Sequence, residues 1–93
     1  MKKQEFINLS KNMVKEYVNT FSEERKVLIK NVYVIGFHDT PDNYRILLSI
    51  EGADDFFYEV VYDKNKKGIH SYVFKQAGNR IIGKRVTNRK GIA

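Results

Sequence analysis

The chain has 93 residues, a formal net charge of +6 and no cysteine. This length allows one domain with a single hydrophobic core, and the lack of cysteine excludes disulfide bonds and thiolate metal ligands. No apolar run is long enough to span a membrane, and the first residues lack the apolar run of a secretory signal, so we expect a cytoplasmic protein without a membrane partner.

The charge is unevenly distributed along the chain. From residue 1 to residue 74, eleven Lys and Arg balance eleven Asp and Glu. The whole excess comes from Lys75, Arg80, Lys84, Arg85, Arg89 and Lys90. A neutral body with a basic end is typical of an interaction segment, although such an end is as often only a solvated terminus.

The first predicted element is an amphipathic helix from Gln4 to about Phe21. Apolar residues recur there at steps of three and four, while polar and charged residues take the other side. The apolar stripe consists of Phe6, Leu9, Met13, Tyr17 and Phe21, widened by Ile7, Val14 and Val18. We expect this stripe to be buried.

Four β-strands are predicted after the helix. The first runs from about Asn31 to His38 and contains Gly36, as at a bulge or a close backbone approach. The next three are "YRILLSIE", "FFYEVVYD" and "IHSYVF", separated by turns, the last of which has Gly68 for a positive φ. The segment "RIIGKRV" adds a fifth strand if it pairs with the edge of the sheet, and "TNRKGIA" then follows it as a frayed tail.

A helix followed by a meander of short strands predicts an α+β fold. The N-terminal amphipathic helix packs on a curled antiparallel sheet of four strands, or five if the basic segment pairs. We place the domain at residues 1–79 and a basic C-terminal extension at residues 80–93, an edge strand followed by a frayed tail.

One helix covers only one face of such a sheet, and the other face is not wholly polar. Tyr33, Ile35 and Phe37 alternate with other apolar residues, as do Phe57 and Val61 in the third strand. An uncovered apolar face is typical of a partner surface or a homodimer, unless sheet curvature and the C-terminal segment cover it. The predicted partner-binding residues are Tyr33, Ile35, Phe37, Arg80, Lys84, Arg85, Arg89 and Lys90.

Nucleic acid is the alternative partner. Three lysines of one turn could form a basic strip with the C-terminal cations, and two aromatic residues of the next strand could stack on bases. The residues of this alternative site are Lys64, Lys66, Lys67, Tyr72 and Phe74. A solvated turn and core aromatic residues would give the same pattern.

No set of residues has the spacing that catalysis requires. His38, Asp39 and Asp42 lie in a segment with strong turn signals, and the adjacent acids Asp54 and Asp55 diverge in a turn. Neither histidine has a second one at metal-ligand spacing, and the glycines follow no nucleotide-binding pattern. We therefore predict no enzyme activity, no metal and no cofactor.

Four consecutive segments resemble a known family over about residues 5–79. They are "EFINLSKNMVKEYVNT", "VYVIGF", "HDTPDNYRILLSI" and "DDFFYEVVYDKNKKGIHSYVFK". Their order and spacing are similar to a domain-of-unknown-function family of small proteins from phages and prophages of Gram-positive bacteria. The most specific positions are Tyr17, Val32 to Val34, Thr40, Asn43, Leu47 to Ser49 and Tyr58 to Tyr62. Members usually stop soon after the position of Asn79, so the basic segment departs from the family.

The resemblance indicates where the protein acts, but the family has no known activity that could be transferred to this chain. It implies a small accessory protein acting inside an infected or lysogenic bacterial cell. We expect a non-enzymatic protein that binds a host protein or protein–nucleic acid complex, as an inhibitor of the anti-CRISPR kind does. The alternative is a nucleic-acid-binding accessory protein that acts through the basic C-terminal end.

Overall fold

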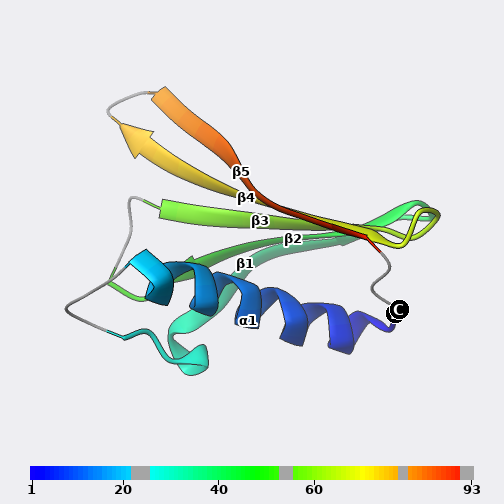
Figure 1. Ribbon diagram of the computed structural model, residues 1–93, viewed down its shortest axis with the longest axis horizontal. Helices are drawn as coiled ribbons and strands as arrows, with labels where there is room; N and C mark the ends of the chain where they lie inside the picture. The colour runs from blue at the N-terminus through cyan, green and yellow to red at the C-terminus, as the bar shows by residue number, and fades with distance from the viewer. Residues whose placement is uncertain (22–25, 53–55, 78–79, 91–93) are drawn as a thin grey trace.

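The computed structural model describes residues 1–21, 26–52, 56–77 and 80–90. One helix lies against a five-stranded antiparallel sheet with the strand order β1-β2-β3-β4-β5 (Figure 1). The elements are α1 (Lys3–Phe21), the short 3-10 helix η1 (Ile29–Asn31), β1 (Val32–Asp39), β2 (Asn43–Ile50), β3 (Phe56–Asp63), β4 (Gly68–Ala77) and β5 (Arg80–Lys90). The predicted α+β fold is confirmed, and the fifth strand is present.

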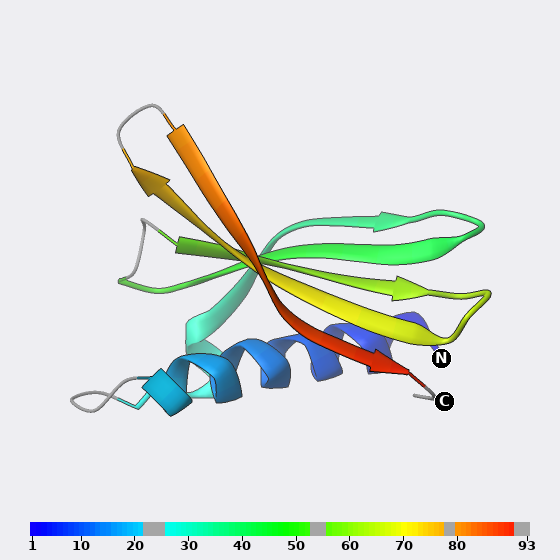
Figure 2. The same ribbon diagram turned by 45° about the horizontal axis from the view of Figure 1, so that its top comes forward.

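The sheet is a meander in which each strand pairs with its neighbours in sequence. Helix α1 packs on β1, β2 and β3, whereas the end of β4 and the start of β5 twist away from it (Figures 1 and 2). Such a twist is usual for antiparallel strands. We call the sheet face under α1 the covered face and the opposite one the open face.

The core lies between α1 and the covered face. The helix contributes Phe6, Met13 and Val14 to it; Leu9 and Tyr17 of the predicted stripe are half-buried, and the side chain of Phe21 lies outside the described residues. Ser10 is also fully buried in this stripe, and its hydroxyl donates to the carbonyl oxygen of Phe6 at 2.7 Å, so its polar group is satisfied. The sheet and the segment before it contribute Val27, Val32, Ile46, Leu48, Ile50, Tyr58, Val60, Tyr62 and Ile69.

Phe6 is the centre of an aromatic cluster at the start of α1. Its ring centroid lies 5.3 Å from Tyr44, 6.2 Å from Phe37 and 6.5 Å from Tyr62. Offset and edge contacts at these distances add to the stabilisation from burial. One helical residue therefore contacts three adjacent strands.

A bulge in β1 reverses the alternation that the sequence suggested. Val34 pairs with Leu48 and Gly36 pairs with Leu47, so Ile35 is an extra residue without a partner in β2. Beyond the bulge, Phe37 pairs with Ile46 and lies on the covered face. The prediction that Phe37 shares the uncovered face with Tyr33 and Ile35 is therefore wrong, because one inserted residue moves every later side chain to the other face.

The β3–β4 turn is held by the carboxylate of Asp63. Its Oδ1 accepts the backbone N–H groups of Asn65 at 2.9 Å and Lys66 at 3.0 Å. The bond from Lys66, more than any other contact, lowers the pKa of Asp63. Lys67 takes the left-handed conformation, with φ 53°, that the sequence had assigned to Gly68, which instead begins β4.

The basic segment forms a full strand along β4. β5 pairs with β4 from Arg80 opposite Ala77 to Lys90 opposite Gly68, with a register shift between the partners of Ser71 and Tyr72. The strand therefore continues past Val86, where the sequence predicted fraying. Residues 91–93 of the predicted tail lie outside the described residues.

A charge in the core should unfold the domain, whereas a charge on the solvent side of α1 should not. Met13 is only 9% exposed, so Met13→Asp buries an unpaired carboxylate at a cost of several kcal/mol, close to the whole stability of about 5 kcal/mol of a small domain. Lys15→Asp is the control. Thermal melting followed by circular dichroism should separate the two variants, and equal melting temperatures would contradict this packing of α1.

The bulge predicts unequal effects for two aromatic residues of β1. Phe37→Ala removes a ring that packs on Phe6 and should lower the free energy of unfolding by about 2–4 kcal/mol. Tyr33→Ala removes a side chain that is 42% exposed and should cost about 1 kcal/mol or less. Urea unfolding of both variants measures the difference. A Tyr33 effect as large as the Phe37 effect would contradict this register.

Candidate binding surface

The open face follows from strict alternation along the central strands. Ile46 and Leu48 are fully buried on the covered face, so Leu47 between them belongs to the open face. Strand register extends this rule to the rest of the sheet, where the large side chains of this face are half-buried or exposed and the small Ser49 is buried. The large members include Tyr33 in β1, Arg45 and Leu47 in β2, Phe57, Glu59 and Val61 in β3, and His70, Tyr72 and Phe74 in β4.

The centre of the open face is aliphatic and contains one ion pair. Leu47 is opposite Glu59, and Arg45 is opposite Val61. Arg45 Nη1 lies 3.6 Å from Glu59 Oε2, with 50% and 22% of the two side chains exposed. Such an exposed pair contributes about 0–1 kcal/mol, so its main effect is to leave the centre of the face without net charge.

The β4 side of the open face is aromatic. The rings of Phe57 and Phe74 are stacked, with centroids 5.2 Å apart and planes at 14°, and Tyr72 lies 6.3 Å from Phe74. Phe74 also covers Gly83 of β5, since a Cβ atom built on Gly83 would lie 2.6 Å from the ring. An aromatic ring over an edge glycine shields the backbone and fixes the pairing of β4 with β5.

The predicted partner-binding residues lie at opposite edges of the sheet. Tyr33 and Ile35 are in β1, the first strand, whereas the five cations are in β5, the last one, with three strands between them. On the open face, the register joins Tyr33 to Arg85 through β2, β3 and β4, whereas Lys84 and Arg89 are opposite the covered-face residues Val73 and Ile69. Sequence reasoning omitted Leu47 from the site, although the alternation of "YRILLSI" already placed it opposite the buried residues.

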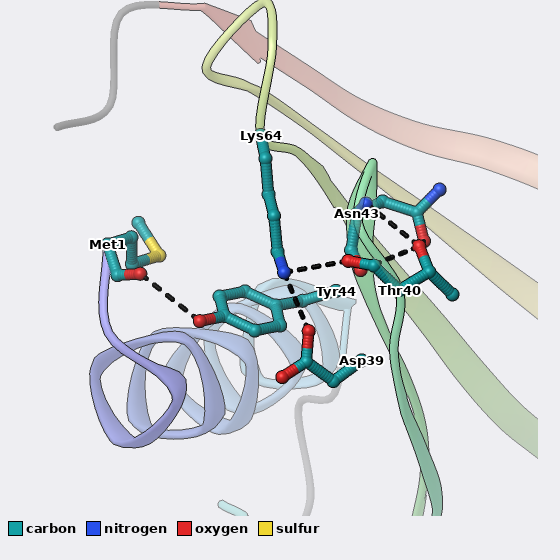
Figure 3. Close-up of polar contacts among 6 residues, drawn as sticks. All are labelled: Met1, Asp39, Thr40, Asn43, Tyr44 and Lys64. Atoms are coloured by element: carbon teal, nitrogen blue, oxygen red, sulfur yellow. Dashed lines mark hydrogen bonds and ion pairs between the residues drawn. The ribbon is translucent and has the colours of Figure 1, made fainter.

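Lys64, predicted for nucleic acid, is part of a clamp between two turns (Figure 3). Its Nζ lies 2.6 Å from Asp39 Oδ1, donates to the carbonyl oxygen of Thr40 at 2.7 Å and sits 4.3 Å from the centroid of the Tyr44 ring. The hydroxyl of Tyr44 donates to the carbonyl oxygen of Met1 at 3.4 Å. The clamp therefore joins the β1–β2 turn, the β3–β4 turn and the start of the chain.

The remaining residues of the predicted nucleic-acid site do not form one cluster. Lys66 and Lys67 are exposed in the β3–β4 turn. Tyr72 and Phe74 lie together on the open face, and Tyr72 is about 17 Å along the strand from Lys67. The residues near Tyr72 and Phe74 on the edge side belong to β5, where Arg85 pairs with Tyr72 and Gly83 with Phe74.

The acidic residues of the β1–β2 segment have turn roles. Asp39 binds Lys64, and Asp42 Oδ1 accepts the side-chain N–H of Asn65 at 3.2 Å. The hydroxyl of Thr40 accepts the backbone N–H of Asn43 at 3.0 Å and closes the turn. Within the described ranges, no group of three or more His, Asp or Glu side chains is placed to hold a metal ion.

Comparison with protein families identifies the chain. The model of a family of unknown function, DUF6275, matches residues 7–84. The chain belongs to this family. The match covers α1 from residue 7, the first four strands and the start of β5, so residues 80–84 of the basic segment lie inside the matched region.

No curated protein and no solved structure gives a significant match to the chain. In the part of the chain that the structure describes, no helix is long and apolar enough to cross a membrane.

Removal of the Lys64 clamp should destabilise the domain. Lys64→Ala loses a charge-assisted hydrogen bond, a bond to Thr40 and a cation–π contact, and should lower the free energy of unfolding by about 1–2 kcal/mol. Lys66→Ala in the same turn is the control, because the Lys66 side chain is exposed. Chemical denaturation measures both variants, and equal midpoints would show that the clamp contributes nothing.

Proposed function

We propose that this protein acts by binding and not by catalysis, and that its partner is a protein that docks on the open face. The observation that carries this proposal is the centre of that face, where Leu47 and Val61 are only half-buried and the neighbouring charges are already paired. Protein interfaces have this composition, with an apolar centre that lacks unpaired charge and a polar rim.

The proposed setting rests on the sequence resemblance. It is the cytoplasm of a Gram-positive bacterium that carries a phage or prophage, where the protein inhibits a host protein by occupying its surface. The basic β5 strand, with Lys84 and Arg85 beside β4, supports this role, because a one-signed strip accelerates encounter with an acidic partner.

Single-stranded nucleic acid is the second candidate partner, favoured by one observation. The β4–β5 register places Arg85 opposite Tyr72, which brings one cationic position next to the aromatic side of the face, whereas Lys84 is opposite Val73 of the covered face. Such a neighbourhood suits a phosphate backbone and stacked bases. The mutual stacking of Phe57 and Phe74 favours the protein partner, because it occupies ring faces that bases would need.

Capture experiments with a matched pair of variants test the proposal. Leu47→Lys places a charge at the centre of the open face, whereas Glu16→Lys places one on the exposed side of α1. We expect purified protein to retain a partner from a lysate of a Gram-positive bacterium, Leu47→Lys to reduce the retained amount about tenfold or more, and Glu16→Lys to leave it unchanged.

Nuclease treatment separates the two candidate partners. A protein partner should survive it, and the purified protein should bind a single-stranded oligonucleotide weakly. Loss of all captured material after nuclease treatment, with tight oligonucleotide binding that falls steeply with salt and is weakened by Phe74→Leu, would favour nucleic acid. Equal capture by both charge variants would contradict a role for the open face.

A further inference from the structure

A second apolar surface lies at the β1 edge of the sheet. Among the residues that the structure describes, six large hydrophobic side chains are strongly exposed, and five of them fall between residues 28 and 35. We call these five the β1-edge patch: Leu28, Ile29, Tyr33, Val34 and Ile35, with exposed fractions from 39% to 54%. Apolar residues concentrated in one exposed segment are typical of an interaction site.

The backbone of this segment is also open to pairing. β1 is the first strand of the sheet and, among the described strands, pairs with β2 alone, so the backbone groups on its outer side have no strand partner there. An apolar edge strand is a template for another strand. The bulge at Ile35 limits regular pairing to a short stretch, so apolar side chains must supply most of the contact.

We propose that two copies of this chain associate through the β1-edge patch, with their β1 strands antiparallel about a twofold axis. The segment from Asn31 to His38 carries no Lys, Arg, Asp or Glu, whereas Lys30 precedes it and Asp39 follows it. An antiparallel pair about a twofold axis lays this uncharged stretch against its own copy, so no like charges oppose each other within it. The centre of the stretch places the axis between Val34 and Ile35.

The other edge of the sheet does not suit self-association. Between Arg80 and Lys90, β5 has five cations and no acid, so two copies of β5 would repel each other. Lys and Arg on an edge strand also protect it from further pairing. Because β1 pairs with a second β1 and β5 does not pair with a second β5, association stops at a closed dimer and does not continue into a filament.

Sedimentation measures the dimer directly. We expect wild type to dimerise with increasing concentration and Ile35→Asp to raise the dissociation constant about 100-fold, since each copy loses one buried isoleucine. Phe56→Asp is the control, because Phe56 is a strongly exposed hydrophobic residue that lies outside the patch. Leu47→Lys should also dimerise, so failure of the open-face proposal and failure of this one are distinguishable.

Cysteine cross-linking tests the position of the axis. The natural chain has no cysteine, so Val34→Cys introduces a single thiol near the axis, within reach of its symmetry mate. Mild oxidation should give a disulfide dimer of Val34→Cys and leave Phe56→Cys monomeric. A wild type that stays monomeric at every concentration, or a dimer that Ile35→Asp does not weaken, would overturn the proposal, as would equal cross-linking of both thiols.

Discussion

The contact of Phe6 with the sheet is the interaction on which the rest of the fold depends. Phe6 is fully buried and its ring meets Phe37, Tyr44 and Tyr62, which belong to three different strands. At the other end of α1, Tyr17 packs against Tyr58, and burial raises the pKa of Tyr58 to about 12. Because α1 is the long helix that packs on β1, β2 and β3 in the described part of the chain, its orientation decides which face is core and which face is available to a partner.

The sequence predicted local structure well and long-range pairing less well. The helical stripe and the alternation of "YRILLSI" and "FFYEVVYD" are period signals, and they gave α1, β2 and β3 nearly to the residue. Gly36 was a correct sign of the bulge, yet neither its φ nor the space around it requires glycine, because a Cβ atom there would meet nothing within 4 Å. The shift of Phe37 to the covered face depends on which β2 residue each β1 residue pairs with, and composition does not encode that choice.

The candidate site was only partly predictable for the same reason. Tyr33 was chosen because it alternates onto an apolar face that one helix cannot cover, and the cations of β5 because they carry most of the net charge, but sheet order separates the two groups by three strands. Lys64 and Lys66 are lysines of the same turn, and the sequence does not distinguish them. The fold brings Lys64 to Asp39 and Tyr44 at the neighbouring turn. Leu47, in contrast, could have been assigned to the site from alternation alone.

The ring of Phe74 lies over Gly83, so the residue type that is possible at one of these positions depends on the other. Gly83 is small because of its neighbour and not because of its own backbone, since a Cβ atom would lie 2.6 Å from the Phe74 ring. Alanine at position 83 is therefore compatible only with a displaced or smaller side chain at position 74, and a smaller residue at 74 removes the need for glycine. Substitution of Gly83 is therefore conditional on position 74, whereas Phe74 can be replaced by a smaller residue while Gly83 is kept, so the two changes have a preferred order.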